Sequence, residues 1–367
     1  MATEGTEDHY LSHASGNWPE PLGTDPLHRP LAEDTPNIHD TGELGSKLRT
    51  VLEDACHGRL HKIEWFKTTW QTSGATTGYG KWQLDDDRVV DVMIKLPVGH
   101  REKFWTARLN HPSAEAWDTR ETLEKPTPRV LASGDNLDGH DLAWLVMERF
   151  NDRPLSHHIT KPHVDQLLYT AARFHASAVK EHQLTDPPDE PDWQKLVQRS
   201  RDQIEAGTVP EEDTWMRLLD NLEKHLPRLV SIWHDRPIDT WCHGDLHPGN
   251  AFVRSLDPDN PHDECCVLID LAMVHAGCWI EDAVYLDRQR WGTHGALFGV
   301  KPVRSLAAHR ERLGLPLEGS WQLLANIRRV LMSATSPAFL HQTGHPEYLA
   351  EACRVLSTLL PVVTSDS

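Results

Sequence analysis

Residues able to hold a phosphate-bound cation are concentrated in one short part of the sequence. Positions 243–250 read HGDLHPGN, which sets Asp245 and Asn250 five positions apart. The proline and glycine between them prevent a helix, and such a loop can point both polar side chains into one cleft. Asp270 follows downstream, at the end of the apolar run CCVLI. Carboxylate and amide oxygens are the hard ligands that Mg²⁺ prefers, so this set predicts a magnesium site.

Phosphoryl transfer is the chemistry that this set fits. The protein gives little covalent help in that reaction, because positioning and cations that neutralise the triphosphate lower most of the barrier. One carboxylate must receive or orient the acceptor hydroxyl, while an amide oxygen and a second carboxylate hold Mg²⁺. We expect Asp245 to take the first role, and Asn250 and Asp270 to take the second.

A lysine that grips the α- and β-phosphates is the remaining requirement, and Lys95 can supply it. It ends the run VDVMIK at positions 90–95, which is typical of a strand. Alternate side chains of a strand point to opposite faces, so Lys95 and Met93 share one face. We expect Met93 to cover the nucleotide base while Lys95 reaches the phosphates. A lone strand lysine would otherwise be a solvated edge charge, and it is the downstream motif that favours the functional interpretation.

The elements that must position these residues change in type near residue 150. Before that point the periodicity predicts an antiparallel arrangement of strands with helices beside it. The expected helices there are 42–58 and about 113–123, and the expected strands are 61–70, 81–84, 88–96, 129–132 and 142–147. After that point the pattern is mainly helical. The clearest helices are expected at 164–178, 213–233 and 321–334.

Composition places the chain among globular proteins with about two lobes. Its 367 residues, 38% hydrophobic and 25% charged, can bury a sizeable core. Residues 1–40 show no sustained period, so we expect a flexible or wrapping arm there. The predicted organisation is that arm, a nucleotide-binding N-lobe over 41–147, and a C-lobe over 148–367 that carries the catalytic loop and the metal and substrate sites. The expected fold class is α+β.

Net charge and hydrophobic patterning limit the classes of molecule that the protein is expected to bind. A formal charge of −18 argues against nucleic acid, whose binding needs a basic face, and it suits a cationic substrate. The N-terminus has neither a basic start nor an apolar segment, and no run of about 18 apolar residues occurs, so we expect a cytoplasmic protein that does not bind membranes. The six cysteines are scattered and are expected to be reduced thiols. The sequence carries no signal for an oligomeric state.

These motifs resemble the aminoglycoside phosphotransferase family, the small-molecule branch of the protein-kinase-like fold. The resemblance is carried by HGDLHPGN at 243–250, Ile269-Asp270, Gly277, Asp282-Ala283, Phe174-His175-Ala176, VMERF at 146–150, and Lys95. It covers roughly residues 45 to 340 and is dense only in the middle. It implies a bilobal fold, with a small antiparallel-sheet N-lobe and a larger, mainly helical C-lobe, that uses ATP and Mg²⁺.

The resemblance also implies roles for single residues. Asp245 would be the catalytic base or hydroxyl-orienting group, as the spacing already suggests. Main-chain groups of Glu148 and Phe150 would bind adenine. His243 and Asp282 would brace the catalytic loop, so that their loss would act through structure as well as rate.

A helix glutamate should pair with Lys95, and Glu115 is our choice because it opens the predicted helix 113–123. Glu121 and Glu124 are also in reach by sequence alone. The loop 72–80 bears glycines but is not G-x-G-x-x-G, so phosphate binding by its backbone is a weaker expectation.

The expected activity is transfer of a phosphoryl group from ATP to a hydroxyl of a small polar molecule, such as an amino sugar, sugar or amino alcohol. Two alternatives stay open: a nucleotide-binding regulatory module without turnover, and a protein kinase. The intact set of Lys95, Asp245, Asn250 and Asp270 speaks against the first. The HGD in place of HRD, and the short spacing from Asp270 to Asp282, speak against the second.

Overall fold

The computed structural model describes residues 43–66, 76–257, 259–260, 262–293, 295–317, 319–339 and 345–365. The described chain divides into two compact units. The first, called here the sheet unit, runs up to Gln183 and includes His243–Val274. The second, called the helical unit, comprises Leu184–Cys242 and the chain from His275 onward. The predicted arm 1–40 lies outside the described residues, and the lobe boundary near residue 147 stays a prediction.

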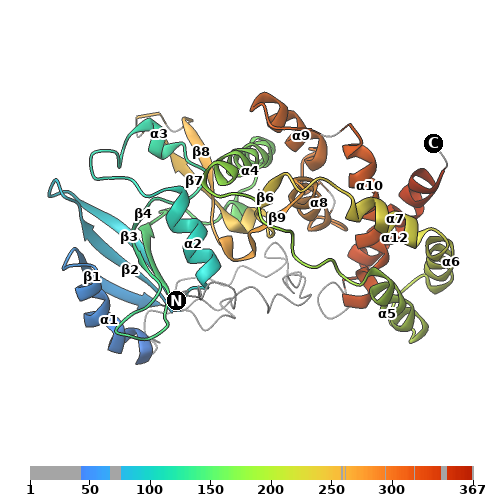
Figure 1. The fold of residues 1–367 in the computed structure, drawn as a ribbon, viewed down its shortest axis with the longest axis horizontal. Coiled ribbons are helices and arrows are strands. Elements are labelled where there is room, and N and C mark those ends of the chain that lie inside the picture. The colour runs from blue at the N-terminus through green and yellow to red at the C-terminus, as the bar shows by residue number, and fades with distance from the viewer. Residues whose placement is uncertain are drawn as a thin grey trace, which may run out of the picture. The chain divides into compact units, whose positions relative to one another are not determined.

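The sheet unit is built on one five-stranded antiparallel sheet (Figure 1). Its strand order is β1-β2-β3-β5-β4. The strands are β1 Leu60–Phe66, β2 Thr76–Gln83, β3 Val89–Leu96, β4 Val130–Gly134 and β5 Trp144–Glu148. The expected antiparallel run of β1, β2 and β3 is therefore confirmed, and so are the two strands that follow it.

The second strand begins at Thr76, whereas the sequence suggested a loop as far as residue 80. Its glycines explain the error. A side chain at Gly78 would place its Cβ 2.8 Å from Cε3 of Trp65, and one at Gly80 would meet Leu60 at 3.0 Å. These glycines therefore make room for large side chains of β1, instead of marking a turn. The remainder of the glycine-bearing loop, residues 72–75, lies outside the described residues.

The two faces of β3 differ as the alternation predicted. Val92 and Ile94 are fully buried in a core that includes Leu52 of α1 (Glu43–Ala55). Met93 lies on the other face and packs against a second cluster that includes Met147 of β5. Helix α1 thus covers one face of the sheet, which leaves the opposite face to Met93 and Lys95.

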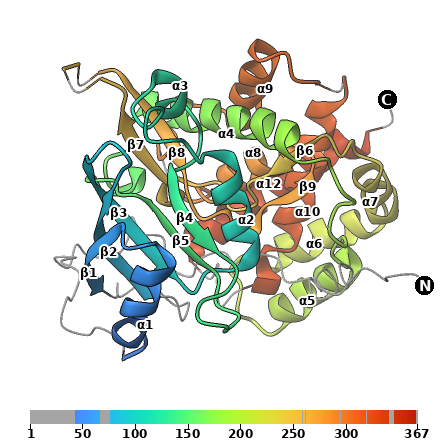
Figure 2. The ribbon, with the colours of Figure 1, turned by 60° about the vertical axis from the view of Figure 1, so that its left-hand side comes forward.

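Helix α2, His100–Leu109, is the main element that the sequence analysis missed. The helix expected over 113–123 is wrong: residues 114–118 form turns, and only the four-residue α3, Arg120–Leu123, is helical. The periodicity misled because α2 is polar over most of its ten residues and follows Pro97 and Gly99, so its apolar stripe is weak. Contacts place α2 beside β4 and β5 (Figures 1 and 2).

Two further elements complete the sheet unit. Helix α4, Lys161–Glu181, matches the predicted helix 164–178 and begins at the side-chain cap of Thr160. Strands β7, Ala251–Ser255, and β8, Glu264–Leu268, form an antiparallel hairpin. The views agree that α4 runs alongside β8, as its contacts require (Figure 2).

The helical unit holds most of the remaining helices. They are α5 Trp193–Glu205, α6 Glu212–Glu223, α7 Leu226–His234, α8 Ile280–Arg288, α9 Pro302–Arg312, α10 Trp321–Ala334 and α12 Pro346–Thr364. Helix α10 matches its prediction, but the helix expected at 213–233 is two helices, because a proline stands in the first turn of α7. Strands β6, Thr240–Cys242, and β9, His275–Gly277, form a short antiparallel pair. No described helix is long and apolar enough to cross a membrane.

Candidate active site

Asp245 and Asn250 are held together by the loop that follows β6. The side-chain amide of Asn250 donates from Nδ2 to Oδ2 of Asp245 at 2.8 Å and to its carbonyl oxygen at 3.1 Å. The turn η2, Pro248–Asn250, closes the loop and leads directly into β7. Because the amide nitrogen is engaged by Asp245, the Asn250 side chain turns its oxygen away from that carboxylate, where it can serve a cation. The predicted juxtaposition of these two residues is confirmed.

Two histidines brace this loop through single tautomers. Nδ1 of His243 accepts the backbone N–H of Asp245 at 3.3 Å, and its Nε2 lies 3.0 Å from the carbonyl oxygen of Ile269. A carbonyl only accepts, so Nε2 of His243 carries the proton. Nδ1 of His247 similarly accepts the N–H of Gly249 at 3.0 Å, which directs its Nε2 toward Oδ2 of Asp245, 3.6 Å away.

Gly244 lets the loop pass close to the segment after Asp270. Its φ is +82°, and a Cβ there would lie 2.2 Å from the carbonyl oxygen of Met273. Only glycine tolerates both the left-handed backbone and this approach. The middle residue of the HGD triplet is therefore fixed by sterics, a requirement that the sequence analysis did not state.

Asp270 follows β8 and is linked to Asn250 through the main chain. The N–H of Ile269 donates to the carbonyl oxygen of Asn250 at 2.9 Å. Asp270 itself adopts a left-handed conformation, φ 61° and ψ 64°, which aspartate tolerates better than most residues. A half-buried carboxylate thus leaves the strand beside the residue that carries the amide oxygen.

Lys95 pairs with Glu102 of α2, at 2.6 Å between Nζ and Oε1. The expected partner Glu115 is therefore wrong: it lies in a turn, is exposed, and its carboxylate bonds Ser113. Helix α2 presents Glu102 to the face of β3 on which Lys95 lies, and the predicted helix that Glu115 was to open does not form. Glu102 was missed because α2 was missed. The signal available was a glutamate seven positions after the strand lysine.

The charge of Asp270 reaches this pair. Burial raises the pKa of Glu102, and the negative charge of Asp270 raises it further, against the lowering effect of Lys95. Burial acts to lower the pKa of Lys95, but the charges of Glu102 and Asp270 outweigh it and raise that pKa. One nearby carboxylate therefore shifts both partners in the same direction. The negative charge of Asp270 therefore acts on Lys95 and Glu102, while the shared site of Lys95 and Asp270 stays a prediction.

Glu148 uses its side chain as well as its backbone. Its buried carboxylate accepts the backbone N–H of Arg129 at 2.9 Å and Nε of Arg129 at 2.8 Å, and it also pairs with Arg254 of β7. The backbone N–H of Glu148 donates to the carbonyl oxygen of Arg129. An adenine contact at this residue would consequently fall on its carbonyl. The clamp formed by Arg129, Glu148 and Arg254 was not foreseen.

Aromatic rings line the chain around Phe150. Its ring stacks on that of Phe252 in β7, with centroids 4.9 Å apart. The guanidinium of the preceding Arg149 lies 3.7 Å from the ring centroid of Tyr79, which pairs in register with Met93. Met93 and Phe150 are thus accompanied by flat surfaces able to contact a nucleotide base. Adenine binding by Glu148 and Phe150 stays a prediction.

Asp282 is fully buried on α8 in the helical unit, where its charge acts on Cys242. Its expected bracing of the catalytic loop stays a prediction. In the same unit Cys242, His275 and Glu281 place potential ligand atoms within 4.8 Å of one another. Glu281 is already paired with Arg236 at 3.0 Å, and burial raises the pKa of the Cys242 thiol, so this group suits a structural network better than a metal.

Sequence and structure comparisons place the chain in a class. The family described as "Phosphotransferase enzyme family" matches residues 101–315, more than half of the chain. The chain belongs to this family, as the resemblance of its motifs indicated. It is accordingly a small-molecule phosphotransferase that acts on a hydroxyl group. No curated protein matches the sequence of this chain.

Solved structures show the same fold at low sequence identity. A spectinomycin phosphotransferase in complex with ADP and spectinomycin is 13% identical, with a TM-score of 0.50 over 85% of this chain and 93% of that one. A microcompartment-associated aminopropanol kinase is 14% identical, with a TM-score of 0.51 over 86% of this chain and 98% of that one. The α+β, protein-kinase-like fold class is therefore confirmed.

Proposed function

We propose that the protein transfers the γ-phosphoryl group of ATP, with Mg²⁺, to a hydroxyl of a small polar molecule. The observation that carries this proposal is the continuity of one charged site. The negative charge of Asp270 shifts the pKa values of Lys95 and Glu102. The backbone N–H of Ile269, the residue before Asp270, donates to the carbonyl oxygen of Asn250, and the side chain of Asn250 donates to Asp245. Every part that phosphoryl transfer requires thus lies within the sheet unit.

Asp245 orients the acceptor hydroxyl and takes its proton. The hydrogen bond from Asn250 fixes the carboxylate at Oδ2, and Nε2 of His247 approaches the same oxygen. In this proposal the acceptor hydroxyl donates to the carboxylate that these contacts hold. Held in this way, the base needs little reorganisation when the proton moves.

The residues present fit Mg²⁺. The amide oxygen of Asn250, turned away from Asp245, and the carboxylate of Asp270 are hard oxygen donors on adjoining segments. The metal would neutralise charge on the β- and γ-phosphates and orient them. Lys95, kept charged by Glu102, binds the α- and β-phosphates from β3.

The net charge of the chain and the names of two similar structures suggest the class of the acceptor. The net charge of −18 suits a cationic molecule, although a neutral sugar fits the same chemistry. The two similar structures are named for spectinomycin and for aminopropanol, and the second name contains both an amine and an alcohol. We therefore place amino sugars and amino alcohols first among candidate acceptors.

The regulatory alternative has less support. A module without turnover has no need for the bonded arrangement of Asp245 and Asn250, yet that arrangement is intact. A peptide acceptor is also disfavoured, because only the turn η3, Leu271–Met273, and the three-residue β9 separate Asp270 from the start of α8 near residue 280.

A screen for ADP release tests the proposal. The purified protein, ATP and Mg²⁺ are mixed separately with amino sugars, sugars, amino alcohols and nucleosides, and products are examined by ³¹P NMR. We expect ADP release above the no-acceptor baseline together with a phosphate monoester resonance. Tight ATP binding without a phosphorylated product from any of these classes would favour the regulatory alternative.

A further inference from the structure

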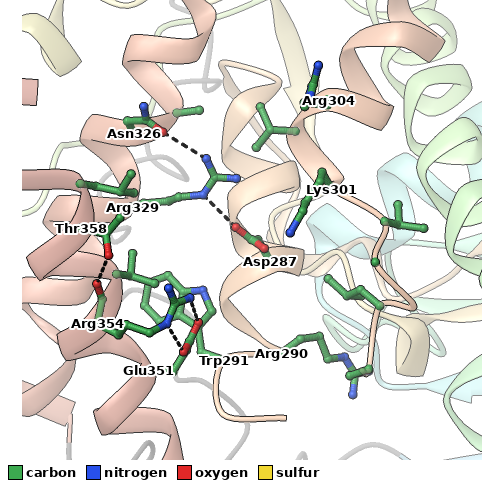
Figure 3. Close-up of a pocket in the computed structure, with 18 of the residues that line it drawn as sticks. Asp287, Arg290, Trp291, Lys301, Arg304, Asn326, Arg329, Glu351, Arg354 and Thr358 are labelled. Atoms are coloured by element: carbon green, nitrogen blue, oxygen red, sulfur yellow. Dashed lines mark hydrogen bonds and ion pairs between the residues drawn. The ribbon is translucent and has the colours of Figure 1, made fainter. Parts of the chain in front are cut away.

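A cavity of about 830 Å³ opens in the helical unit. Its walls come from the end of α8, the chain leading into α9, and faces of α10 and α12 (Figure 3). All of its lining residues lie between positions 287 and 359, so the cavity belongs to one unit and contains no member of the candidate active site. Its volume is within the range of sites that hold small organic molecules.

The charge of this lining is opposite to that of the chain. Its ionisable side chains are mainly cationic. The cations are Arg290, Lys301, Arg304, Arg329 and Arg354, against the carboxylates Asp287 and Glu351. Five cations and two anions leave a formal surplus of three positive charges, whereas the whole chain carries −18. Positive charge gathered in a hollow attracts anions from solution.

Both carboxylates are already neutralised by neighbours. Nε of Arg329 donates to Oδ2 of Asp287 at 2.8 Å, and Nε of Arg354 donates to Oε2 of Glu351 at 2.7 Å. Figure 3 shows the first pair in the middle of the view and the second below it. The surplus positive charge is consequently not cancelled by the carboxylates of the lining.

Lys301 and Arg304 supply exposed positive charge at the start of α9. Within the described chain no ion pair joins either side chain to a carboxylate. In Figure 3 the ammonium of Lys301 points toward the side of the cavity where Arg329 and Asp287 lie. Helices α9 and α10 both begin at this wall, and neither start has a side-chain cap. Helix N-termini carry partial positive charge, which adds to the attraction for an anion.

The rest of the wall is apolar and partly aromatic. It includes the indoles of Trp291 and Trp321 and the side chains of Leu297, Val300 and Val355. An inorganic anion would leave this surface uncovered. We propose that the cavity binds a small organic anion with an apolar or aromatic body, the charged end near Lys301 and the body against the tryptophans. This inference does not rest on the proposed function.

A pair of dyes distinguishes the need for a negative charge from the need for an aromatic body. 8-Anilinonaphthalene-1-sulfonate carries an aromatic body and a sulfonate, and N-phenyl-1-naphthylamine has the same rings without the charge. Fluorescence titration of the full chain should show saturable binding of the sulfonate dye that weakens as salt is raised, because salt screens exposed charges. The neutral dye should bind more weakly by about tenfold or more, consistent with loss of a charged contact.

Variants that remove a positive charge and a variant that removes a negative charge should change the affinity for the dye in opposite directions. Lys301→Gln should weaken binding of the sulfonate dye about fivefold, the worth of one exposed ion pair, and Lys301→Gln/Arg304→Gln should weaken it further. Asp287→Asn, which releases Arg329 from its carboxylate, should tighten binding. Lys195→Gln on α5, an exposed cation outside the lining, is the matched control and should have no effect.

Either of two results would overturn the proposal. One is equal affinity for the sulfonate dye in the double variant and in Lys195→Gln. The other is equal affinity of wild type for the charged and neutral dyes. Because Lys301, Arg304 and Lys195 are exposed, we expect all the lysine and arginine variants to fold, and thermal melts verify this.

Discussion

The catalytic roles at the residue scale depend on hydrogen bonds that fix single atoms. Asn250 donates from its amide nitrogen to the carbonyl oxygen and to Oδ2 of Asp245, and these two hydrogen bonds orient the side-chain oxygen of Asn250 and hold Oδ2 of Asp245. His243 and His247 carry out a similar task for the backbone of the loop. The HGDLHPGN segment therefore supplies its own scaffold, and two of its residues are proposed for chemistry.

Glu102→Gln tests the ion pair between Lys95 and Glu102, which the structure shows in place of the predicted pair of Lys95 with Glu115. Loss of its charge leaves Lys95 with a weaker partner in a mostly buried position, so the ammonium is less firmly held toward the phosphates. A hydrogen bond to a charged group is worth about 1.5–3 kcal/mol, which corresponds to about 10- to 100-fold weaker ATP binding. Calorimetry measures the dissociation constant. Glu115→Gln is the control and should bind ATP as wild type does; equal affinity in the two variants would contradict the assignment.

Asp270→Ala tests the metal site. Removal of this carboxylate deletes one of the two proposed hard ligands, so we expect ATP binding to lose its dependence on Mg²⁺. Titrations with ATP in the presence and absence of Mg²⁺ provide the measurement. If Mg²⁺ strengthened ATP binding in the variant as much as in wild type, Asp270 would not be a ligand.

At the scale of structural elements, the close approach of two backbone segments positions the candidate site. The catalytic loop and the segment after Asp270 touch at Gly244, where the space for a side chain is already occupied by Met273. This contact aligns two loops that come from separate strands. Displacement of about 1 Å at such a contact can lower turnover about 10²-fold.

Gly244→Ala should therefore lower turnover about 10²-fold and also lower the melting temperature, because the Cβ forces the two segments apart. Gly139→Ala is a matched control: its φ is +75°, close to that of Gly244, but nothing lies within 4 Å of its Cβ. It should show only the backbone strain of about 1–2 kcal/mol, with normal turnover. Steady-state kinetics and thermal melts distinguish the two. Equal loss of turnover in both variants would show that strain alone, without the clash, explains the effect.

The elements show where sequence reasoning succeeds and where it fails. The strand β3 was predictable because VDVMIK places β-branched residues at every second position, and α10 because its apolar positions recur at helical spacing. Helix α2 was not predictable, since polar and charged residues leave it a weak apolar stripe and its place is decided by packing against β4 and β5. Glycines in β2 were taken for a loop, although the bulk of Trp65 requires Gly78 and that of Leu60 requires Gly80. Asp245, Asn250 and Asp270 were found because local spacing encodes them, whereas Glu102 depends on a tertiary contact.

The whole chain carries a formal net charge of −18, yet some of its arginines are buried, among them Arg236 and Arg328. In the helical unit, Glu281 lies at the centre of a network with Arg236 at 3.0 Å, His275 at 3.6 Å and Arg328 at 3.8 Å. Burial alone would raise the pKa of Glu281, but the hydrogen bond with His275 and the two guanidinium charges hold that pKa well below its ordinary range. The network joins β9, α8 and α10.

This network predicts a specific dependence of stability on pH. A carboxyl group whose pKa is lower in the folded state stabilises the fold above its unfolded pKa of about 4.3, and that contribution is lost as pH falls toward the folded value. Glu281→Gln should cost about 3–5 kcal/mol at pH 7, because the buried Arg236 and Arg328 lose a nearby negative charge, although Arg236 keeps its ion pair with Glu190. The cost should shrink below about pH 4.

Urea unfolding followed by tryptophan fluorescence measures this difference, since Trp193 and Trp233 lie beside Arg328. The exposed Glu205 of α5 provides the control variant, Glu205→Gln, which should unfold near the wild-type urea midpoint at neutral and at acidic pH. A Glu281→Gln deficit that stayed constant from pH 7 to about pH 2.5 would show that the ionised carboxylate is not the source of the stability.

The most direct test of the central claim is the turnover of Asp245→Asn with the best acceptor from the ADP-release screen. Asparagine keeps the size of the side chain but cannot take the proton of the hydroxyl. We predict that kcat falls by about 10² to 10⁴, the usual worth of a positioned general base, while the dissociation constant for ATP stays near the wild-type value. Turnover at the wild-type rate in Asp245→Asn would contradict the account.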